Sequence, residues 1–89
     1  MAWKVELDPA AARELDRLDP VNARRIVAFL YQRVAALDNP RSIGDALKGA
    51  KFGEFWRYRV GDYRIICSIE DRFVRILVVT IGNRREVYR

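Results

Sequence analysis

The chain contains no histidine and a single cysteine, Cys67, among its 89 residues. One cysteine excludes an intramolecular disulfide, and the lack of histidine and further thiols excludes a zinc finger. The absence of histidine also removes the side chain that most often moves protons near neutral pH. Any catalysis must therefore use other residue types.

Long hydrophobic runs are also missing. The longest, "ILVVTI" at 76–81, is far too short to cross a bilayer. The first residues, "MAWKVELDP", carry three charges and match neither a signal peptide nor an anchor. A lone thiol fits a reducing interior. We therefore expect one small cytoplasmic domain, covering residues 1–89, with no membrane partner.

Positive charge is plentiful but unevenly placed. The net charge is +5, and residues 1–47 are balanced, with seven basic and seven acidic side chains. Residues 48–89 hold ten basic and five acidic side chains, so they carry the whole excess. Arginine, with its planar and permanently charged guanidinium, dominates and suits phosphate recognition. A merely soluble basic surface is the alternative.

The N-terminal half predicts a strand followed by two helices. "WKVEL" at 3–7 alternates apolar and polar residues, as a half-buried strand does. Asp8-Pro9 and Asp19-Pro20 each supply an N-cap followed by proline at the first helical position. We expect helices over about 9–18 and 20–37, which form a helical hairpin.

The C-terminal half predicts three strands, at 54–60, 63–69 and 72–81. The turns between them, "GD" and "ED", are short, so the strands should form sequential hairpins. Residues 42–53 are expected to be a loop in which Leu47 is buried. The order β-α-α-β-β-β predicts an α+β fold, an antiparallel sheet with the helical hairpin packed on one face.

The first of these hairpins, "FWRYRVGDYRII" at 55–66, places like charges together. A two-residue turn at Gly61-Asp62 sets Arg59 opposite Arg64 and Arg57 opposite Ile66. Side-chain alternation gives one apolar side, which should face the helices. That side comprises Trp56, Tyr58, Val60, Tyr63, Ile65 and Cys67. This parity makes core packing, rather than base stacking, the expected role of Trp56.

The opposite side should carry Arg57, Arg59 and Arg64, where facing like charges disfavour strand pairing. A sequence that works against its own fold often does so at a functional site. The C-terminal "GNRREVYR" adds Arg84, Arg85 and Arg89, together with Tyr88. Cations with a nearby aromatic ring suit single-stranded RNA. Alternatively, the three arginines simply fan into water.

Three segments, "LKG", "WRYRVGDYRI" and "IGNRREVY", make the chain resemble the RelE/ParE toxin superfamily, specifically its RelE branch. The resemblance extends over the chain and includes the predicted order of elements. It implies the toxin of a type II toxin–antitoxin system, an endoribonuclease that enters the ribosomal A site and cleaves messenger RNA. It also implies no metal or cofactor, attack by the messenger's own 2′-hydroxyl, and inhibition by a cognate antitoxin. Operator DNA would be bound only through the antitoxin complex.

The resemblance also implies roles for individual residues. Arg57 and Arg59 occupy the positions of family lysines linked to activating the 2′-hydroxyl and stabilising the transition state. Arg64 matches an arginine that binds the scissile phosphate. Arg84 matches one linked to the leaving 5′-oxygen, and Tyr88 matches the tyrosine that stacks on the target base.

Two differences from the family pattern concern the general base. A guanidinium with a pKa above about 12 is a poor base, so Arg57 and Arg59 suit electrostatic stabilisation better. Asn83 stands where many relatives have histidine. Glu54 or Glu86 could act as the general base instead, although nothing in the sequence around them distinguishes them from ordinary surface carboxylates. Cys67 replaces a residue that is usually aromatic, and is expected to be a small core residue.

Lys48, Lys51 and Arg85 are candidate RNA-binding residues, with solvated surface charge as the alternative. Arg24, Arg25 and Arg33, on the second predicted helix, have solvent exposure as the default expectation. Two other functions stay open. One is non-catalytic inhibition of DNA gyrase, as in the ParE branch. The other is a degenerate toxin that only binds its antitoxin and operator DNA.

Overall fold

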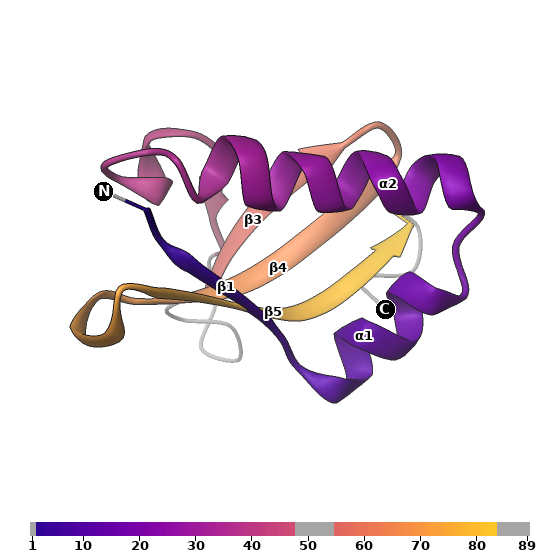
Figure 1. Ribbon diagram of the computed structural model, residues 1–89, viewed down its shortest axis with the longest axis horizontal. Helices are drawn as coiled ribbons and strands as arrows, with labels where there is room; N and C mark the ends of the chain where they lie inside the picture. The colour runs from indigo at the N-terminus through magenta and orange to yellow at the C-terminus, as the bar shows by residue number, and fades with distance from the viewer. Residues whose placement is uncertain (1, 48–54, 84–89) are drawn as a thin grey trace.

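The fold combines a five-stranded sheet with helices on one of its faces (Figure 1). The computed structural model describes residues 2–47 and 55–83. The longer elements are β1 (Lys4–Leu7), α1 (Pro9–Asp16), α2 (Pro20–Ala28), β3 (Phe55–Val60), β4 (Tyr63–Glu70) and β5 (Arg75–Asn83). The shorter ones are η1 (Phe29–Val34), η2 (Pro40–Ser42), β2 (Asp45–Ala46) and η3 (Asp71–Phe73).

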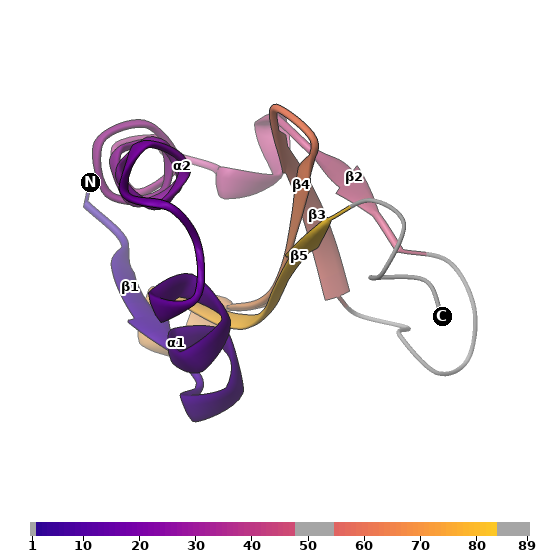
Figure 2. The same ribbon diagram turned by 90° about the vertical axis from the view of Figure 1, so that its right-hand side faces the viewer.

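The strand order in the sheet is β1-β5-β4-β3-β2, and the pairing is antiparallel except between β1 and β5, which are parallel. The α+β class is confirmed, with two differences. The first strand pairs in parallel with the last, and the expected loop at 42–53 contains the two-residue strand β2. Seen from the side, both helices lie on the same face of β3, β4 and β5 (Figure 2).

Both helices begin at the predicted Asp-Pro signals. The Asp8 carboxylate accepts a hydrogen bond from the Ala10 N–H at 3.1 Å, and Asp19 accepts one from the Asn22 N–H at 3.1 Å. These side chains satisfy N–H groups that have no partner within the helix. The prediction of two N-caps followed by proline is therefore confirmed.

Both helices end earlier than predicted. The chain leaves α1 after Asp16 because the Arg17 N–H is shared between two carbonyls and Leu18 bonds to Leu15 at 3.2 Å, which tightens the last turn. The second helix continues from α2 into η1, a π-helical segment, and ends at Val34 rather than 37. There the Ala35 carbonyl accepts the Trp3 N–H at 2.8 Å, which ties the helix end to the N-terminal strand.

The core fills the space between the helices and the sheet. Its buried members are Ala11, Ile26, Leu30, Val34, Tyr58, Ile65, Cys67, Ile76, Val78 and Ile81. Trp56, Val60 and Tyr63 pack against them, so the predicted apolar side of the hairpin is confirmed. Burying each large side chain contributes about 1.5–3 kcal/mol. Burial also raises the pKa of the Cys67 thiol, which is a core residue as expected.

The β3–β4 hairpin has the predicted register. Arg59 pairs with Arg64, Tyr58 with Ile65 and Arg57 with Ile66. Gly61 has a φ of +58°, whereas Asp62 is not among the described residues with positive φ, a combination typical of a type II′ turn. Leu47 is buried, as expected for the preceding segment.

The second hairpin turn differs from its prediction. In place of a two-residue turn at "ED", the chain forms η3 and closes at Val74, which lies in the left-handed region with φ 48°. The following strand consequently starts at Arg75 instead of 72 and continues to Asn83. Left-handed valine is energetically unfavourable, so sequence rules place no turn there. Within the described residues, no helix is long and apolar enough to span a membrane.

Candidate nucleic-acid interface

Three arginines of the β3–β4 hairpin share the side of the sheet that faces away from the helices. Arg57 and Arg59 lie two residues apart on β3, and Arg64 lies directly opposite Arg59 on β4. The register therefore brings these three predicted residues onto one surface, which we call the arginine face (Arg57, Arg59 and Arg64). Directly opposite residues on antiparallel strands have Cβ atoms about 4.5–5.5 Å apart, so two guanidiniums begin from adjacent positions.

The three side chains differ in their surroundings. Arg59 is exposed, Arg64 is half-buried, and the Arg64 Nη1 donates to the Tyr63 carbonyl at 3.3 Å. The Arg57 side chain is only 20% exposed, and its Nη2 lies 3.2 Å from the Asp45 Oδ2. Arg57 is thus held by a carboxylate, whereas Arg59 extends into solvent.

Asp45 was missed by the sequence interpretation. It belongs to β2, and the β2–β3 register places it directly opposite Arg57. Residues opposite each other on paired strands point to the same side, so Asp45 lies at the edge of the arginine face. A two-residue strand has no detectable periodicity, so no sequence signal could have indicated this carboxylate.

A cleft of about 410 Å³ lies where β2 and β3 approach η1, on the helix-facing side of the sheet to which Tyr58 belongs. Its lining residues are Phe29, Arg33, Ile43, Gly44, Asp45, Tyr58 and Arg59. The Arg33 guanidinium carbon lies 5.8 Å from the centre of the Phe29 ring, a cation–π distance. Arg33, expected to be only a solvated helix residue, thus contributes to the same cleft as Arg59.

Several predicted site residues lie outside the described residues. They are Lys48, Lys51, Arg84, Arg85 and Tyr88, together with the alternative bases Glu54 and Glu86. The last described part of β5 pairs Gly82 with Arg64 and Asn83 with Tyr63. The end of β5 therefore lies beside Arg64.

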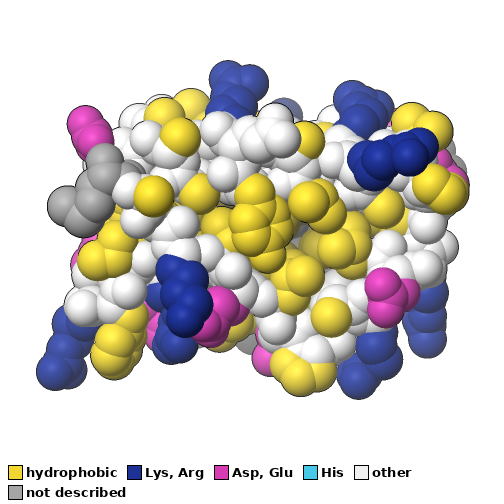
Figure 3. Space-filling view, viewed as in Figure 1, with side chains coloured by type: hydrophobic (Ala, Val, Ile, Leu, Met, Phe, Trp, Pro, Cys, Tyr) yellow, Lys and Arg dark blue, Asp and Glu magenta, His cyan; other side chains and the backbone are white. Residues whose placement is uncertain are grey.

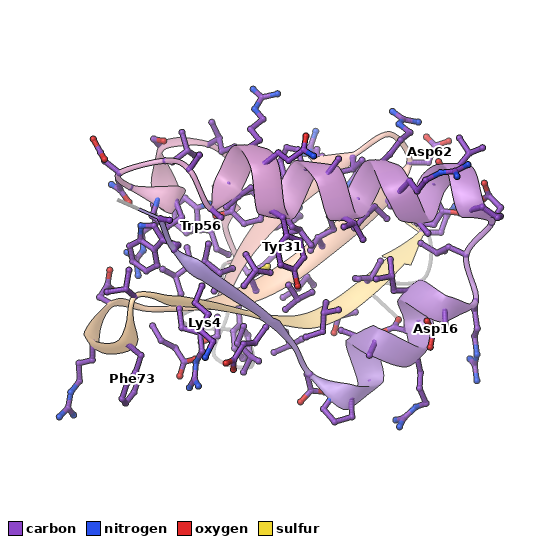
Figure 4. The ribbon with its side chains drawn as sticks, viewed as in Figure 1. Lys4, Asp16, Tyr31, Trp56, Asp62 and Phe73 are labelled. Atoms are coloured by element: carbon purple, nitrogen blue, oxygen red, sulfur yellow. The ribbon has the colours of Figure 1, made fainter. Side chains whose placement is uncertain are left out.

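Trp56 behaves as predicted from strand parity. Its indole N–H donates to the Ile43 carbonyl at 2.8 Å, and the ring packs against the core. Its position at the base of the hairpin is visible in Figure 4. Base stacking by Trp56 is therefore not supported by its surroundings.

Two further arginines, Arg41 and Arg75, form ion pairs near η3. Arg41 makes two hydrogen bonds to Asp71, at 3.0 and 2.9 Å, which join η2 to η3. Arg75 makes a two-point contact with Glu70, at 2.6 and 2.9 Å, and also reaches Glu6. In residues 2–47 and 55–83, no group of three potential metal ligands is found.

A second surface feature lies between the helices. An apolar groove of about 620 Å³ is lined mainly by Leu15, Leu18, Ala23, Val27 and Tyr31 of α1, α2, their connection and η1. Figure 3 shows hydrophobic side chains gathered in this region below α2. The Tyr31 hydroxyl donates to the Val5 carbonyl at 3.5 Å, and Figure 4 shows Tyr31 pointing from its helix toward the strand below.

Known proteins resemble the chain over nearly its full length. Residues 5–88 match the family described as the ParE toxin of the type II toxin–antitoxin system, parDE. Toxin RelE of Mycobacterium tuberculosis is 32% identical over 87 residues, which cover 98% of this chain and 87% of the relative. Toxin RelG of the same organism is 26% identical and covers 100% of this chain and 99% of the relative.

Among solved structures, a chain of the toxin–antitoxin complex RelBE2 from Mycobacterium tuberculosis superposes with a TM-score of 0.85. The match covers 97% of this chain and 95% of that chain at 21% identity. At this identity the structural likeness shows a shared fold. The family match and the curated relatives carry the functional comparison.

Proposed function

This chain belongs to the RelE/ParE family of type II toxin–antitoxin toxins and is of the RelE kind, and on that premise we propose that it is an endoribonuclease. It acts in the cytoplasm on messenger RNA in the ribosomal A site and thereby inhibits translation. The single observation that carries the proposal is the arginine face, where Arg59 faces Arg64 across the hairpin and Arg57 lies on the same side.

The arrangement costs stability and suits phosphate. Like charges opposite each other disfavour pairing by a few tenths of a kcal/mol up to about 1 kcal/mol. A phosphodiester placed over them adds attractions that outweigh this repulsion, and its charge grows in the transition state. The electrostatic energy of the arginine face is therefore more favourable with a phosphate bound than in the free protein.

The proposed reaction is attack of a ribose 2′-hydroxyl on the adjacent phosphorus. The 2′-oxygen forms a bond to phosphorus while the bond to the 5′-oxygen breaks, leaving a 2′,3′-cyclic phosphate and a 5′-hydroxyl. Arg64 binds the scissile phosphate, and Arg57 and Arg59 stabilise the charge that develops on it. Arg84 stabilises the leaving oxygen, Tyr88 stacks on the base, and Lys48, Lys51 and Arg85 hold neighbouring RNA.

The experiment that tests this proposal maps messenger 5′ ends after synthesis of the toxin in a translating extract, with and without ribosomes. We expect new ends at defined codon positions only when ribosomes are present. A message with a 2′-deoxynucleotide at the cleaved position should stay intact, because the nucleophile is missing. Intact message in an extract that has nonetheless stopped translating would contradict the proposal.

Gyrase inhibition is the second candidate, because the matched family is described as the ParE toxin of parDE. A supercoiling assay with purified DNA gyrase distinguishes the two. Loss of supercoiling with undamaged messenger would place the chain with the gyrase inhibitors. If the chain is active in neither assay, the remaining candidate is a degenerate toxin that only binds its antitoxin and operator DNA.

A cognate antitoxin is the proposed protein partner, and operator DNA is bound only through that complex. The apolar groove between α1 and α2 supports this part of the proposal, since exposed apolar grooves commonly receive an amphipathic segment. Val27→Glu places a charge at the half-exposed rim of this groove. It should weaken neutralisation by the antitoxin at least tenfold while cleavage by the free toxin is kept; Val21→Glu, outside the groove lining, is the matched control.

A further inference from the structure

A line of arginines follows the side of the second helix that faces β3. Arg25 of α2 and Arg33 of η1 are both exposed and stand eight positions apart, with Phe29 midway between them. Residues four apart share one side of a helix, and eight residues rise about 12 Å along it. The two guanidiniums therefore start from points that several successive phosphates of a nucleic-acid strand would span. Figure 3 shows basic side chains that project beyond α2 at the upper edge of the molecule.

Contacts place both arginines at the gap between the helix and β3. Arg33 lines the cleft of about 410 Å³ together with Arg59 of β3. The guanidinium atoms of Arg25 lie 3.5 to 3.8 Å from the position that a Cβ on Gly61 would occupy, so Arg25 reaches from α2 to the β3–β4 turn. Three guanidiniums thus follow this gap from the turn to η1. We call Arg25, Arg33 and Arg59 the arginine strip.

The floor of the cleft is aromatic and is fixed by its own contacts. The Phe29 ring meets the Tyr58 ring edge to face, with the centroids 5.8 Å apart and the planes at 63°. Tyr58 is buried, and its hydroxyl donates to the Pro40 carbonyl at 2.7 Å. The Arg33 guanidinium carbon lies 5.8 Å from the centre of the Phe29 ring. One cation of the strip is therefore held over an ordered ring before any ligand binds, which lowers the entropy cost of binding.

The charge of the arginine strip is not neutralised by the described part of the chain. Within it, Arg25, Arg33 and Arg59 form no ion pair. The carboxylate that lines the cleft belongs to Asp45, and it lies 3.2 Å from Arg57 of the arginine face. Three like charges around one cleft produce a positive potential that attracts a polyanion.

Arg59 connects the strip to the arginine face. The described pairing of β2 involves Trp56 and Arg57 of β3, so Arg59 lies at the outer edge of the described sheet. Its register opposite Arg64 assigns it to the arginine face, and it also lines the cleft on the helix-facing side. Positive charge is therefore continuous around this edge, from the proposed cleavage site to the helix.

We propose that the arginine strip binds the phosphate backbone of an RNA segment other than the cleaved linkage, an inference that rests on the proposed ribonuclease function. Guanidiniums spaced along a line match regularly spaced phosphates, and the stacked Phe29 and Arg33 offer a surface to an unpaired base. The segment belongs either to ribosomal RNA or to messenger beside the cleaved position, since both present the same backbone. Its binding positions the arginine face on the scissile phosphate and takes no part in the chemical step.

The test is the double variant Arg25→Gln/Arg33→Gln, which removes two charges of the strip and leaves Arg59 in place. Its affinity is measured at several salt concentrations for vacant ribosomes and for a free single-stranded RNA oligonucleotide. The affinity should fall at least tenfold, and the dependence of log K on log salt should become shallower by about 1.5, since two phosphate contacts are lost. A loss on vacant ribosomes assigns the segment to ribosomal RNA, whereas a loss confined to the oligonucleotide assigns it to messenger.

The matched control is Arg13→Gln/Arg72→Gln, which removes the same charge from exposed positions on α1 and η3 that do not line the cleft. It should keep nearly the wild-type affinity and salt dependence. Cleavage separates docking from chemistry. The single-turnover rate of the strip variant on programmed ribosomes should stay within about threefold of the wild type at saturating toxin, and should fall with the affinity at low toxin concentration.

Two results overturn the inference. If the strip variant and the control pair bind RNA equally well and with the same salt dependence, the strip makes no phosphate contacts; the ribonuclease function would then stand without it. If the strip variant keeps its RNA affinity but is no longer neutralised by the antitoxin, the strip receives an acidic protein segment instead. A wild type that binds RNA through the strip yet leaves messenger intact supports the inference and removes the nuclease function. Thermal unfolding of each variant shows whether a loss of affinity comes from a loss of fold.

Discussion

The arginines near η3 and those of the arginine face differ in their partners. At the end formed by η3, Arg41 contacts Asp71, and Arg75 contacts both Glu70 and Glu6. On the arginine face, Arg59 pairs directly with another arginine, and Asp45 is the one carboxylate that the described residues place in an ion pair there. The same residue type therefore stabilises the fold near η3 and opposes strand pairing on the arginine face.

This difference indicates where to seek function. The ion pairs of Arg41 and Arg75 account for the positions of these two side chains within the fold. Cations that face one another remain unexplained by folding, and a bound polyanion would relieve their repulsion. The comparison can be tested with substitutions of arginines near η3 and on the arginine face.

The largest expected effect comes from removing one arginine at each end. Arg64→Ala should reduce messenger cleavage at least 100-fold and abolish growth arrest, because it removes the proposed phosphate ligand. Its thermal stability should be unchanged or slightly higher. Arg75→Ala should have the opposite outcome, a lower Tm with growth arrest retained, since it leaves Glu70 and Glu6 without their shared partner.

Growth curves and differential scanning calorimetry on the same pair of variants check this prediction. Both substitutions remove one positive charge and one long side chain, so each serves as the other's control. Full toxicity of Arg64→Ala would contradict the prediction, since Arg64 would then be as dispensable for function as Arg75.

A smaller effect, on stability, should follow from giving the arginine face its own ion pair. Arg59→Glu places a carboxylate directly opposite Arg64, so a repulsive cross-strand pair becomes attractive. We expect stability to rise by about 0.5–1 kcal/mol, while messenger cleavage is lost. Urea unfolding and the cleavage assay measure the two changes. Arg59→Gln, which only removes the repulsion, should give a smaller gain.

An unchanged or lower stability for Arg59→Glu would show that the facing arginines carry no strain in the free protein. The proposed conflict between folding and function would then be absent at this pair. Repeating the unfolding at higher salt gives a further check. The stability gain of Arg59→Glu should become smaller, because ionic strength screens the exposed charges.

The sequence predicted the parts of the fold that local chemistry determines. A glycine-first two-residue turn fixes the register of β3 and β4, and alternation then assigns each side chain to the core or to the arginine face. The two Asp-Pro caps likewise determine where the helices begin. These features depend on residues that are neighbours in sequence or across one tight turn.

The features that sequence analysis missed depend on contacts between distant segments. Asp45 reaches Arg57 because β2 adds to the sheet edge, and two residues carry no periodic signal. The left-handed Val74 is stabilised by its place between β4 and β5 against its own preference. The roles assigned to Arg84 and Tyr88 depend on the family resemblance, and they stay predictions.

The smallest expected effect is the pH dependence of stability that the ion pairs near η3 confer. The hydrogen bonds from Arg75 hold the pKa of Glu70 below its ordinary value of 4.5, and those from Arg41 hold the pKa of Asp71 below 3.8. Because both pKa values are lower in the folded state, the stabilisation is complete above these ordinary values. It should decrease as the pH falls below 4.5 and continue to decrease through the folded-state values.

Glu70→Gln and Asp71→Asn should flatten this part of the stability curve, and their difference from the wild type should be greatest near neutral pH and smallest in strong acid. Urea midpoints between pH 7 and pH 2.5 measure it, with Asp62→Asn as the control in the exposed turn. If the variants lost stability equally at every pH, then packing of these side chains, rather than the charge of their carboxylates, would distinguish this end of the sheet from the arginine face.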